Sequence, residues 1–77
     1  MTRQEFITKL EELLEVSSGT LSGETILGNN MRWDSLVMVG FMALVDENMG
    51  FAPAPRDIVQ CRTVDDLVRI VSSGITD

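Results

Sequence analysis

Apolar side chains recur every three or four residues near both ends of this chain, which is the spacing of one face of an α-helix. The first set consists of Phe6, Ile7, Leu10, Leu13 and Leu14, and the last of Val64, Leu67, Val68 and Val71. No segment shows the strict alternation of apolar and polar residues that a half-buried strand requires. The pattern therefore predicts helices that bury their apolar faces against one another.

Capping residues predict where these two helices begin and end. Thr2 and Glu5 have the spacing of a capping box, so the first helix is expected over about residues 3–15. Thr63 precedes two aspartates, which favour the positive end of a helix. The last helix is therefore expected to open there and to run to Gly74.

A long connection, residues 17–33, follows the first helix and is rich in Gly, Ser, Thr and Asn. Loops above roughly 12–15 residues are uncommon in compact domains unless they are functional or held against the core. Five apolar side chains are expected to hold this one: Leu21, Ile26, Leu27, Met31 and Trp33. The connection is therefore interpreted as a crossover within one domain.

A hydrophobic second helix is predicted to begin at Asp34 or Ser35 and to end near Gly50, which can take the left-handed cap conformation. Two prolines in residues 51–55 predict a turn, because proline lacks a backbone donor and resists helix. A short third helix over residues 56–60 follows.

Residues 1–77 are thus predicted to form a single all-α domain, a small four-helix bundle with three main helices, a short third helix and a long first crossover loop. The hydrophobic fraction of 44% is enough for one core, and the formal charge of -6 disfavours nucleic acid and anionic lipid as partners. The longest apolar run is about half the roughly 20 residues that span a bilayer, and acidic residues interrupt the N-terminus where a secretory signal is apolar. We expect a cytoplasmic monomer with no membrane contact.

The residue types exclude several kinds of site. The chain has no histidine and one cysteine, Cys61, so neither a His-activated nucleophile nor a cysteine-built zinc site can form. No oxyanion-hole signature accompanies any serine, and no catalytic residue and no metal site is predicted. Cys61 is expected to be a buried, inert thiol. The acidic cluster Glu11, Glu12 and Glu15 is expected to be a solvated helix face.

When the residues of the predicted second helix are projected around its axis at about 100° per residue, they fall on two faces. Its core members are expected to be Met38, Phe41, Val45 and Met49. Asp46 and Glu47 mark the side that meets water. The other residues on that side are small or apolar: Leu36, Val39, Gly40 and Ala43. Either the crossover covers them, through Met31 or Trp33, or they form a contact patch for a partner.

The hydroxyl of Ser35 lies where a polar loop gives way to this hydrophobic helix. The first backbone N–H groups of a helix have no internal partner and make that end partly positive, so a phosphate ester on Ser35 would lie in a favourable field. Aspartate and serine are also favoured helix caps, and capping alone would equally explain Asp34 and Ser35. The position favours an attachment point over a catalytic residue.

Several segments make the chain resemble the acyl carrier and peptidyl carrier protein family over nearly its whole length. They are Trp33-Asp34-Ser35-Leu36, Met42-Ala43-Leu44, the Gly50 turn and Thr63-Val64-Asp65-Asp66-Leu67. In that family the serine of the Asp-Ser-Leu motif receives 4′-phosphopantetheine from coenzyme A through a separate magnesium-dependent transferase. The resemblance implies that Ser35 is the modified residue, that Asp34 assists recognition by the transferase, and that Leu36 lies at the partner interface.

The resemblance also implies a function. We expect a freestanding carrier, not itself an enzyme, that holds acyl or aminoacyl intermediates as thioesters. Its expected partners are a phosphopantetheinyl transferase, an acyl- or aminoacyl-loading ligase, and downstream synthase or transferase enzymes.

Carriers of general fatty acid synthesis resemble one another in an acidic second helix. Here Val37, Val39 and Gly40 occupy its first turns, and only Asp46 and Glu47 are acidic. We therefore expect a specialised polyketide, peptide or aminoacyl pathway. The alternatives are general fatty acid synthesis and an unmodified helical adaptor that binds through the second-helix face.

Overall fold

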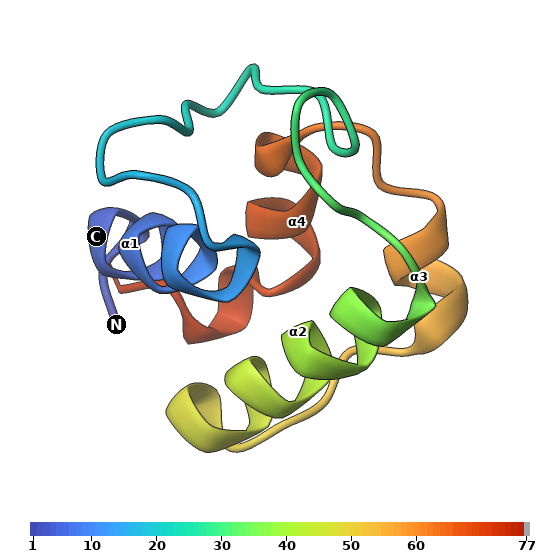
Figure 1. The fold of residues 1–77 in the computed structure, drawn as a ribbon. Coiled ribbons are helices and arrows are strands. Elements are labelled where there is room, and N and C mark those ends of the chain that lie inside the picture. The colour runs from blue at the N-terminus through green and yellow to red at the C-terminus, as the bar shows by residue number, and fades with distance from the viewer. Residues whose placement is uncertain (77) are drawn as a thin grey trace.

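The computed structural model describes residues 1–76, which form four α-helices and one short 3-10 helix (Figure 1). They are α1 (Arg3–Leu14), α2 (Ser35–Met49), α3 (Pro55–Val59), α4 (Val64–Ile70) and η1 (Ser72–Gly74). α1 packs against both α2 and α4, and α3 packs against α4. The described residues form no strand, only one isolated antiparallel bridge, so the all-α prediction is confirmed. None of the helices in this part of the chain is both long and apolar enough to cross a membrane.

The first two helices begin as predicted, because their caps are local. The Glu5 N–H donates to the Thr2 hydroxyl at 3.1 Å, and the Thr2 N–H donates to the Glu5 carboxylate at 2.8 Å. Asp34 caps α2 with its side chain. Gly50 ends α2 in the left-handed conformation, at φ 80°, with its N–H donating to the Asp46 carbonyl.

Two boundaries differ clearly from the prediction, and α1 and α3 each end one residue earlier than predicted, at Leu14 and Val59. α3 begins at Pro55, which was assigned to the preceding turn; proline suits the first position of a helix, where its missing N–H leaves no bond unmade. α4 ends at Ile70 and not at Gly74. At Val71 the backbone leaves the helical conformation, and the η1 turn brings Gly74 so close to α2 that a side chain there would collide with Met49.

The core lies where α1, α2 and α4 meet. Its buried members are Phe6, Ile7, Leu10, Leu14, Leu21, Phe41, Val45, Ile58, Val64, Leu67 and Val71. The rings of Phe6 and Phe41 join α1 to α2 edge to face, with centroids 6.0 Å apart. On α2, Phe41 and Val45 are fully buried, whereas Met38 and Met49 are partly buried at the edge of the core.

The crossover is bound to the start of α4 by backbone hydrogen bonds. The Val64 N–H donates to the Thr25 carbonyl at 3.1 Å, and the Asp65 N–H donates to the Gly23 carbonyl at 2.9 Å. These donors belong to the first turn of α4 and have no acceptor inside the helix. The crossover, drawn across the top of Figure 1, therefore supplies acceptors for the first two N–H groups of α4.

Four of the five side chains expected to hold the crossover do so. Leu21 is buried, and Leu27, Met31 and Trp33 pack against the core. The prediction for Ile26 is wrong, since its side chain is 56% exposed. Ile26 pairs with Thr63 in the isolated bridge, and because extended backbone alternates its side chains, Leu27 turns inward and Ile26 outward.

Glu11 is also not the solvated residue that its acidic neighbours suggested. Its side chain is only 3% exposed, and its carboxylate accepts the Leu21 N–H at 3.0 Å. Burial of a polar group is tolerated when a hydrogen bond replaces the lost water. Glu11 therefore anchors the beginning of the crossover to α1, while Glu12 and Glu15 remain exposed.

Candidate functional site

The N-terminal tip of α2 presents one serine. The Asp34 carboxylate accepts the Val37 N–H at 3.1 Å, and the Asp34 carbonyl accepts the Met38 N–H at 2.9 Å. Ser35 is the first helical residue and is exposed. In the described part of the chain, neither its hydroxyl nor its backbone N–H makes a hydrogen bond. The hydroxyl is thus accessible at the positive end of a fifteen-residue helix.

A cation lies beside the capping carboxylate. The Nε of Arg32 donates to Oδ2 of Asp34, and both side chains are largely exposed. This hydrogen bond, followed by that from the Val37 N–H, holds the pKa of Asp34 below its usual range. Asp34 therefore stays ionised at the tip of α2. The sequence analysis did not single out Arg32, although a basic residue two positions before a capping acid is a readable signal.

Trp33 anchors the end of the crossover to α2. Its ring meets the ring of Phe41 at a centroid distance of 6.1 Å and an angle of 65°. Neither Trp33 nor Met31 covers the outer face of α2, because Leu36 and Val39 remain 65% and 62% exposed. The interpretation in which the crossover hides these two residues is therefore wrong.

An apolar groove opens beside Ser35, between α2 and α3. Its volume is about 230 Å³, and every lining residue except Ser35 is apolar: Met38, Val39, Met42, Pro55, Ile58 and Val59. Val59 is 61% exposed at its edge. The sequence analysis missed the contribution of α3, because a helix of five residues is too short to show a periodic face.

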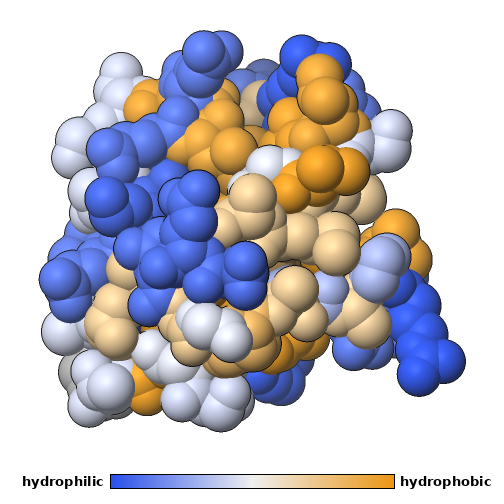
Figure 2. Space-filling model, turned by 90° about the horizontal axis from the view of Figure 1, so that it is seen from below, coloured by the Kyte–Doolittle hydropathy of each residue, from blue (hydrophilic) through white to orange (hydrophobic). Residues whose placement is uncertain are grey.

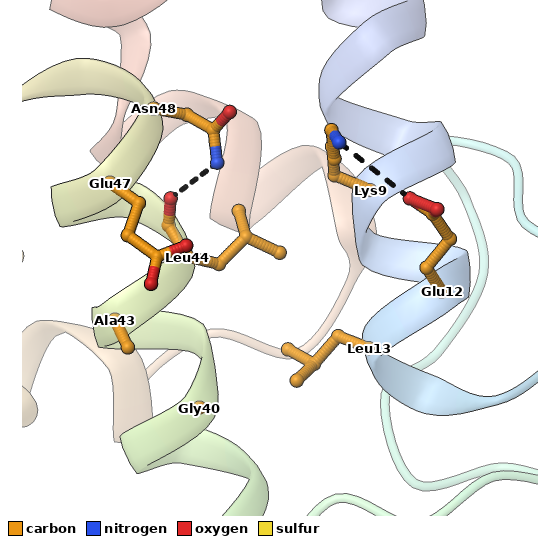
Figure 3. Close-up of a pocket in the computed structure, with 8 residues that line it drawn as sticks. All are labelled: Lys9, Glu12, Leu13, Gly40, Ala43, Leu44, Glu47 and Asn48. Carbon is orange, nitrogen blue, oxygen red and sulfur yellow. Dashed lines mark hydrogen bonds and ion pairs between the residues drawn. The ribbon is translucent and has the colours of Figure 1, made fainter.

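A second groove flanks the opposite side of α2, against α1. Figure 3 shows Leu13 of α1 extending toward Gly40 and Ala43 of α2, with charged side chains nearer the other end of the groove. A Cβ on Gly40 would lie 2.9 Å from Cδ1 of Leu13. Gly40 is thus the point of close approach between the two helices, whereas Ala43 is exposed.

The solvent-facing residues of α2 form a ridge between these grooves, defined by Leu36, Val39, Ala43, Asp46 and Glu47. Figure 2 views the molecule from the α2 side and shows hydrophobic atoms spread across the middle and upper part of this face, with hydrophilic atoms to the left. Asp46 and Glu47 are exposed and make no ion pair within the described residues. The ridge is therefore apolar near Ser35 and acidic toward its C-terminal end.

Cys61 lies apart from this site, between α3 and α4. Its side chain is partly buried, and its thiol donates to the Asp57 carbonyl at 3.3 Å. Burial, together with the nearby carboxylates of Asp66 and Asp57, raises the pKa of this thiol. A protonated thiol is a poor nucleophile, in keeping with an inert role.

Comparison with protein families places most of the chain in one alignment. A family model described as "Phosphopantetheine attachment site" matches residues 4–71, which include the crossover, all four helices except the first residue of α1, and both flanking grooves. No curated protein and no solved structure was found to match the chain.

Proposed function

This chain belongs to the family of phosphopantetheine attachment domains, and we propose that it is a carrier whose arm is attached through the Ser35 hydroxyl. The family match confirms the resemblance drawn from the sequence, and with it the cofactor, covalent 4′-phosphopantetheine. The proposal concerns the residue that bears the arm, the surface that meets the partners and the kind of pathway.

The observation that carries the proposal is the exposed hydroxyl of Ser35 at the first position of α2. A phosphodiester formed there would gain from the aligned backbone dipoles and the free N–H groups of the helix tip. Asp34 holds that tip in helical form, and its ionised carboxylate is available for recognition by the transferase. These local features support attachment of the arm at Ser35.

The arm, when bound, supplies a terminal thiol that holds the cargo as a thioester. The apolar groove beside Ser35, with a volume of about 230 Å³, is suited to a short hydrophobic group. Tethering raises the effective concentration of the cargo at each partner enzyme. We assign the chemistry to the partner enzymes, since carriers of this family hold the cargo for them.

The α2 ridge is the proposed contact surface. Near Ser35 it presents Leu36, Val39 and Ala43, with Asp46 and Glu47 about three turns farther along. Gly40 is assigned to the edge of this surface, where α1 approaches. We propose that the transferase, the acyl- or aminoacyl-loading ligase and the downstream synthase or transferase enzymes dock mainly through apolar contact. This favours a specialised polyketide, peptide or aminoacyl pathway over general fatty acid synthesis.

Incubation with coenzyme A, magnesium and a broad-specificity phosphopantetheinyl transferase tests the attachment. We expect mass spectrometry to show one added arm on the wild-type chain and none on Ser35→Ala. Ser73→Ala, which removes another exposed hydroxyl, is the matched control and should accept the arm. If a transferase that modifies a known carrier adds nothing to the wild-type chain, the unmodified adaptor is favoured instead.

The salt dependence of partner binding tests the docking mode. Exposed charge pairs are screened over about 10 Å at 0.1 M salt, whereas apolar contacts are not. We expect the affinity of the transferase to change little between low and moderate salt. A steep fall would indicate docking through Asp46 and Glu47 on a basic surface, as in general fatty acid synthesis.

A further inference from the structure

Arg32 has donors to spare at the tip of α2. A guanidinium carries five N–H groups, and Arg32 uses its Nε to reach Asp34. Within the described residues, its two terminal nitrogens donate no hydrogen bond. The side chain is 62% exposed and begins three residues before Ser35. A cation with unused donors therefore contacts Asp34, the residue next to the proposed attachment point.

Attachment of the arm changes the charge balance of this tip. The Asp34 carboxylate is already an anion there, held ionised by Arg32 and by the Val37 N–H. A phosphodiester on the adjacent Ser35 adds a second anion. The helix tip attracts both, but the two repel each other, and a cation that contacts both relieves this repulsion. Guanidinium groups suit that task, because their planar fork can bind two oxyanions at once.

We propose that Arg32 is a positioning residue that bridges the Asp34 carboxylate and the phosphodiester on Ser35. This inference rests on the proposed function, because it requires the arm on Ser35. The bridge would hold the root of the arm at the tip of α2, beside the apolar groove. The arm would then be held by a covalent bond to Ser35 and by an ionic contact with Arg32. Only the part of the arm beyond the phosphate would move freely.

Two other arginines serve as comparisons. Arg56 follows Pro55, which lines the same groove as Ser35, so Arg56 is the rival cation for the phosphate. Arg69 pairs with Asp66 at 3.0 Å on α4, in an exposed ion pair like that of Arg32 with Asp34. Removing Arg69 therefore controls for the general loss of one surface charge.

The test compares the arm-bearing forms of the wild-type chain, Arg32→Gln, Arg56→Gln and Arg69→Gln by phosphorus NMR. We expect the phosphorus signal to be displaced by Arg32→Gln and to be unchanged by the other two substitutions. Arg32→Lys, which keeps the charge but loses the fork, should give a smaller displacement. In the wild-type chain, the guanidinium N–H signals of Arg32 should shift between the apo and arm-bearing forms, while those of Arg69 stay in place.

The outcomes separate this inference from the proposed function. If mass spectrometry shows the arm but the Arg32 signals do not change, or if Arg56→Gln displaces the phosphorus signal and Arg32→Gln does not, the bridge is overturned and the carrier function stands. If no arm is added to the wild-type chain, the carrier function fails and the bridge fails with it. Because Arg32 is exposed, its substitution is not expected to unfold the chain, and circular dichroism checks this.

Discussion

The N-terminal tips of α2 and α4 are both capped by a side chain, but one tip is exposed and the other is buried. Each tip has a side-chain cap, Asp34 on α2 and Thr63 on α4. At α4 the first helical residue, Val64, is fully buried, and its N–H donates to the crossover. At α2 the corresponding residue, Ser35, is exposed, and its N–H has no acceptor among the described residues.

The difference comes from what packs over each tip. The crossover covers the tip of α4, where the Gly23 carbonyl accepts the Asp65 N–H, and Arg3 of α1 pairs with the Asp65 carboxylate at 2.7 Å. A side chain on Gly23 would collide with both partners of that pair. A helix tip attracts acceptors and anions in either case. Coverage by the rest of the chain makes the α4 tip structural and leaves the α2 tip open to solvent.

Substitution of the first residue in each helix should give the largest contrast. Val64→Ala is expected to lower the free energy of unfolding by about 2 kcal/mol, because it removes fully packed methyl groups. Ser35→Ala should change it by less than about 0.5 kcal/mol. Urea unfolding followed by circular dichroism measures both. Ser35→Ala should prevent addition of the arm, whereas Val64→Ala should still accept it. Equal destabilisation by the two substitutions would contradict the contrast between the tips.

The anchor of the crossover offers a second test of the covered tip. Glu11→Ala leaves the buried Leu21 N–H without an acceptor, so we expect a loss of about 1–3 kcal/mol in unfolding free energy. Glu12→Ala, one residue on and exposed, is the matched control and should cost less than about 0.5 kcal/mol. A similar small cost for both substitutions would mean that the crossover is held without Glu11.

Removal of the caps should affect the two tips alike in stability and differently in modification. Asp34→Ala and Thr63→Ala are each expected to cost about 1 kcal/mol, the usual value of an N-cap. Only Asp34→Ala should also slow addition of the arm, because Asp34 lies beside Ser35. Initial rates with the transferase, taken at a temperature where both variants are folded, measure this. Equal rates for the two would argue against recognition through Asp34.

The smallest expected effect is a difference in how the pKa values of Asp34 and Asp66 respond to loss of their arginine partners. The pKa of Asp34 is lowered mainly by its hydrogen bond with Arg32, whereas the pKa of Asp66 is lowered mainly by the N–H groups of Arg62 and Thr63. Arg32→Gln should therefore raise the pKa of Asp34 by more than Arg69→Gln raises that of Asp66. Carbon NMR titration of the carboxyl groups measures both.

The sign of the linked stability follows. A carboxyl whose pKa is lower in the folded state stabilises that state above its ordinary pKa, near 3.8, and this stabilisation is lost as the pH falls through the folded value. Arg32→Gln should therefore reduce the loss of unfolding free energy that protonation of Asp34 causes at low pH. Arg69→Gln should leave the corresponding loss from protonation of Asp66 nearly unchanged. Equal changes at the two tips would contradict the contrast.

The parts of this protein that the sequence predicted are those governed by neighbouring residues. The capping box of Thr2 and Glu5, the cap of Asp34 and the left-handed Gly50 each involve residues within four positions of one another. The helical stripes likewise depend on spacing alone. For the same reason, the position of Ser35 at a helix tip was predictable, and so was the family to which the chain belongs.

The remaining features depend on residues far apart in the chain. Glu11 is buried because the crossover returns over it, and Ile26 is exposed because its backbone pairs with Thr63. Beyond the early end of α4, the η1 turn brings Gly74 against Met49 of α2. The apolar groove beside Ser35 exists only where α2 and α3 pack together. Sequence alone determined that this chain forms helices and where a hydroxyl meets a helix tip, since those are short-range effects of backbone geometry and capping. The tertiary structure decided which tip is covered and which is open, because burial depends on long-range packing that no local pattern encodes.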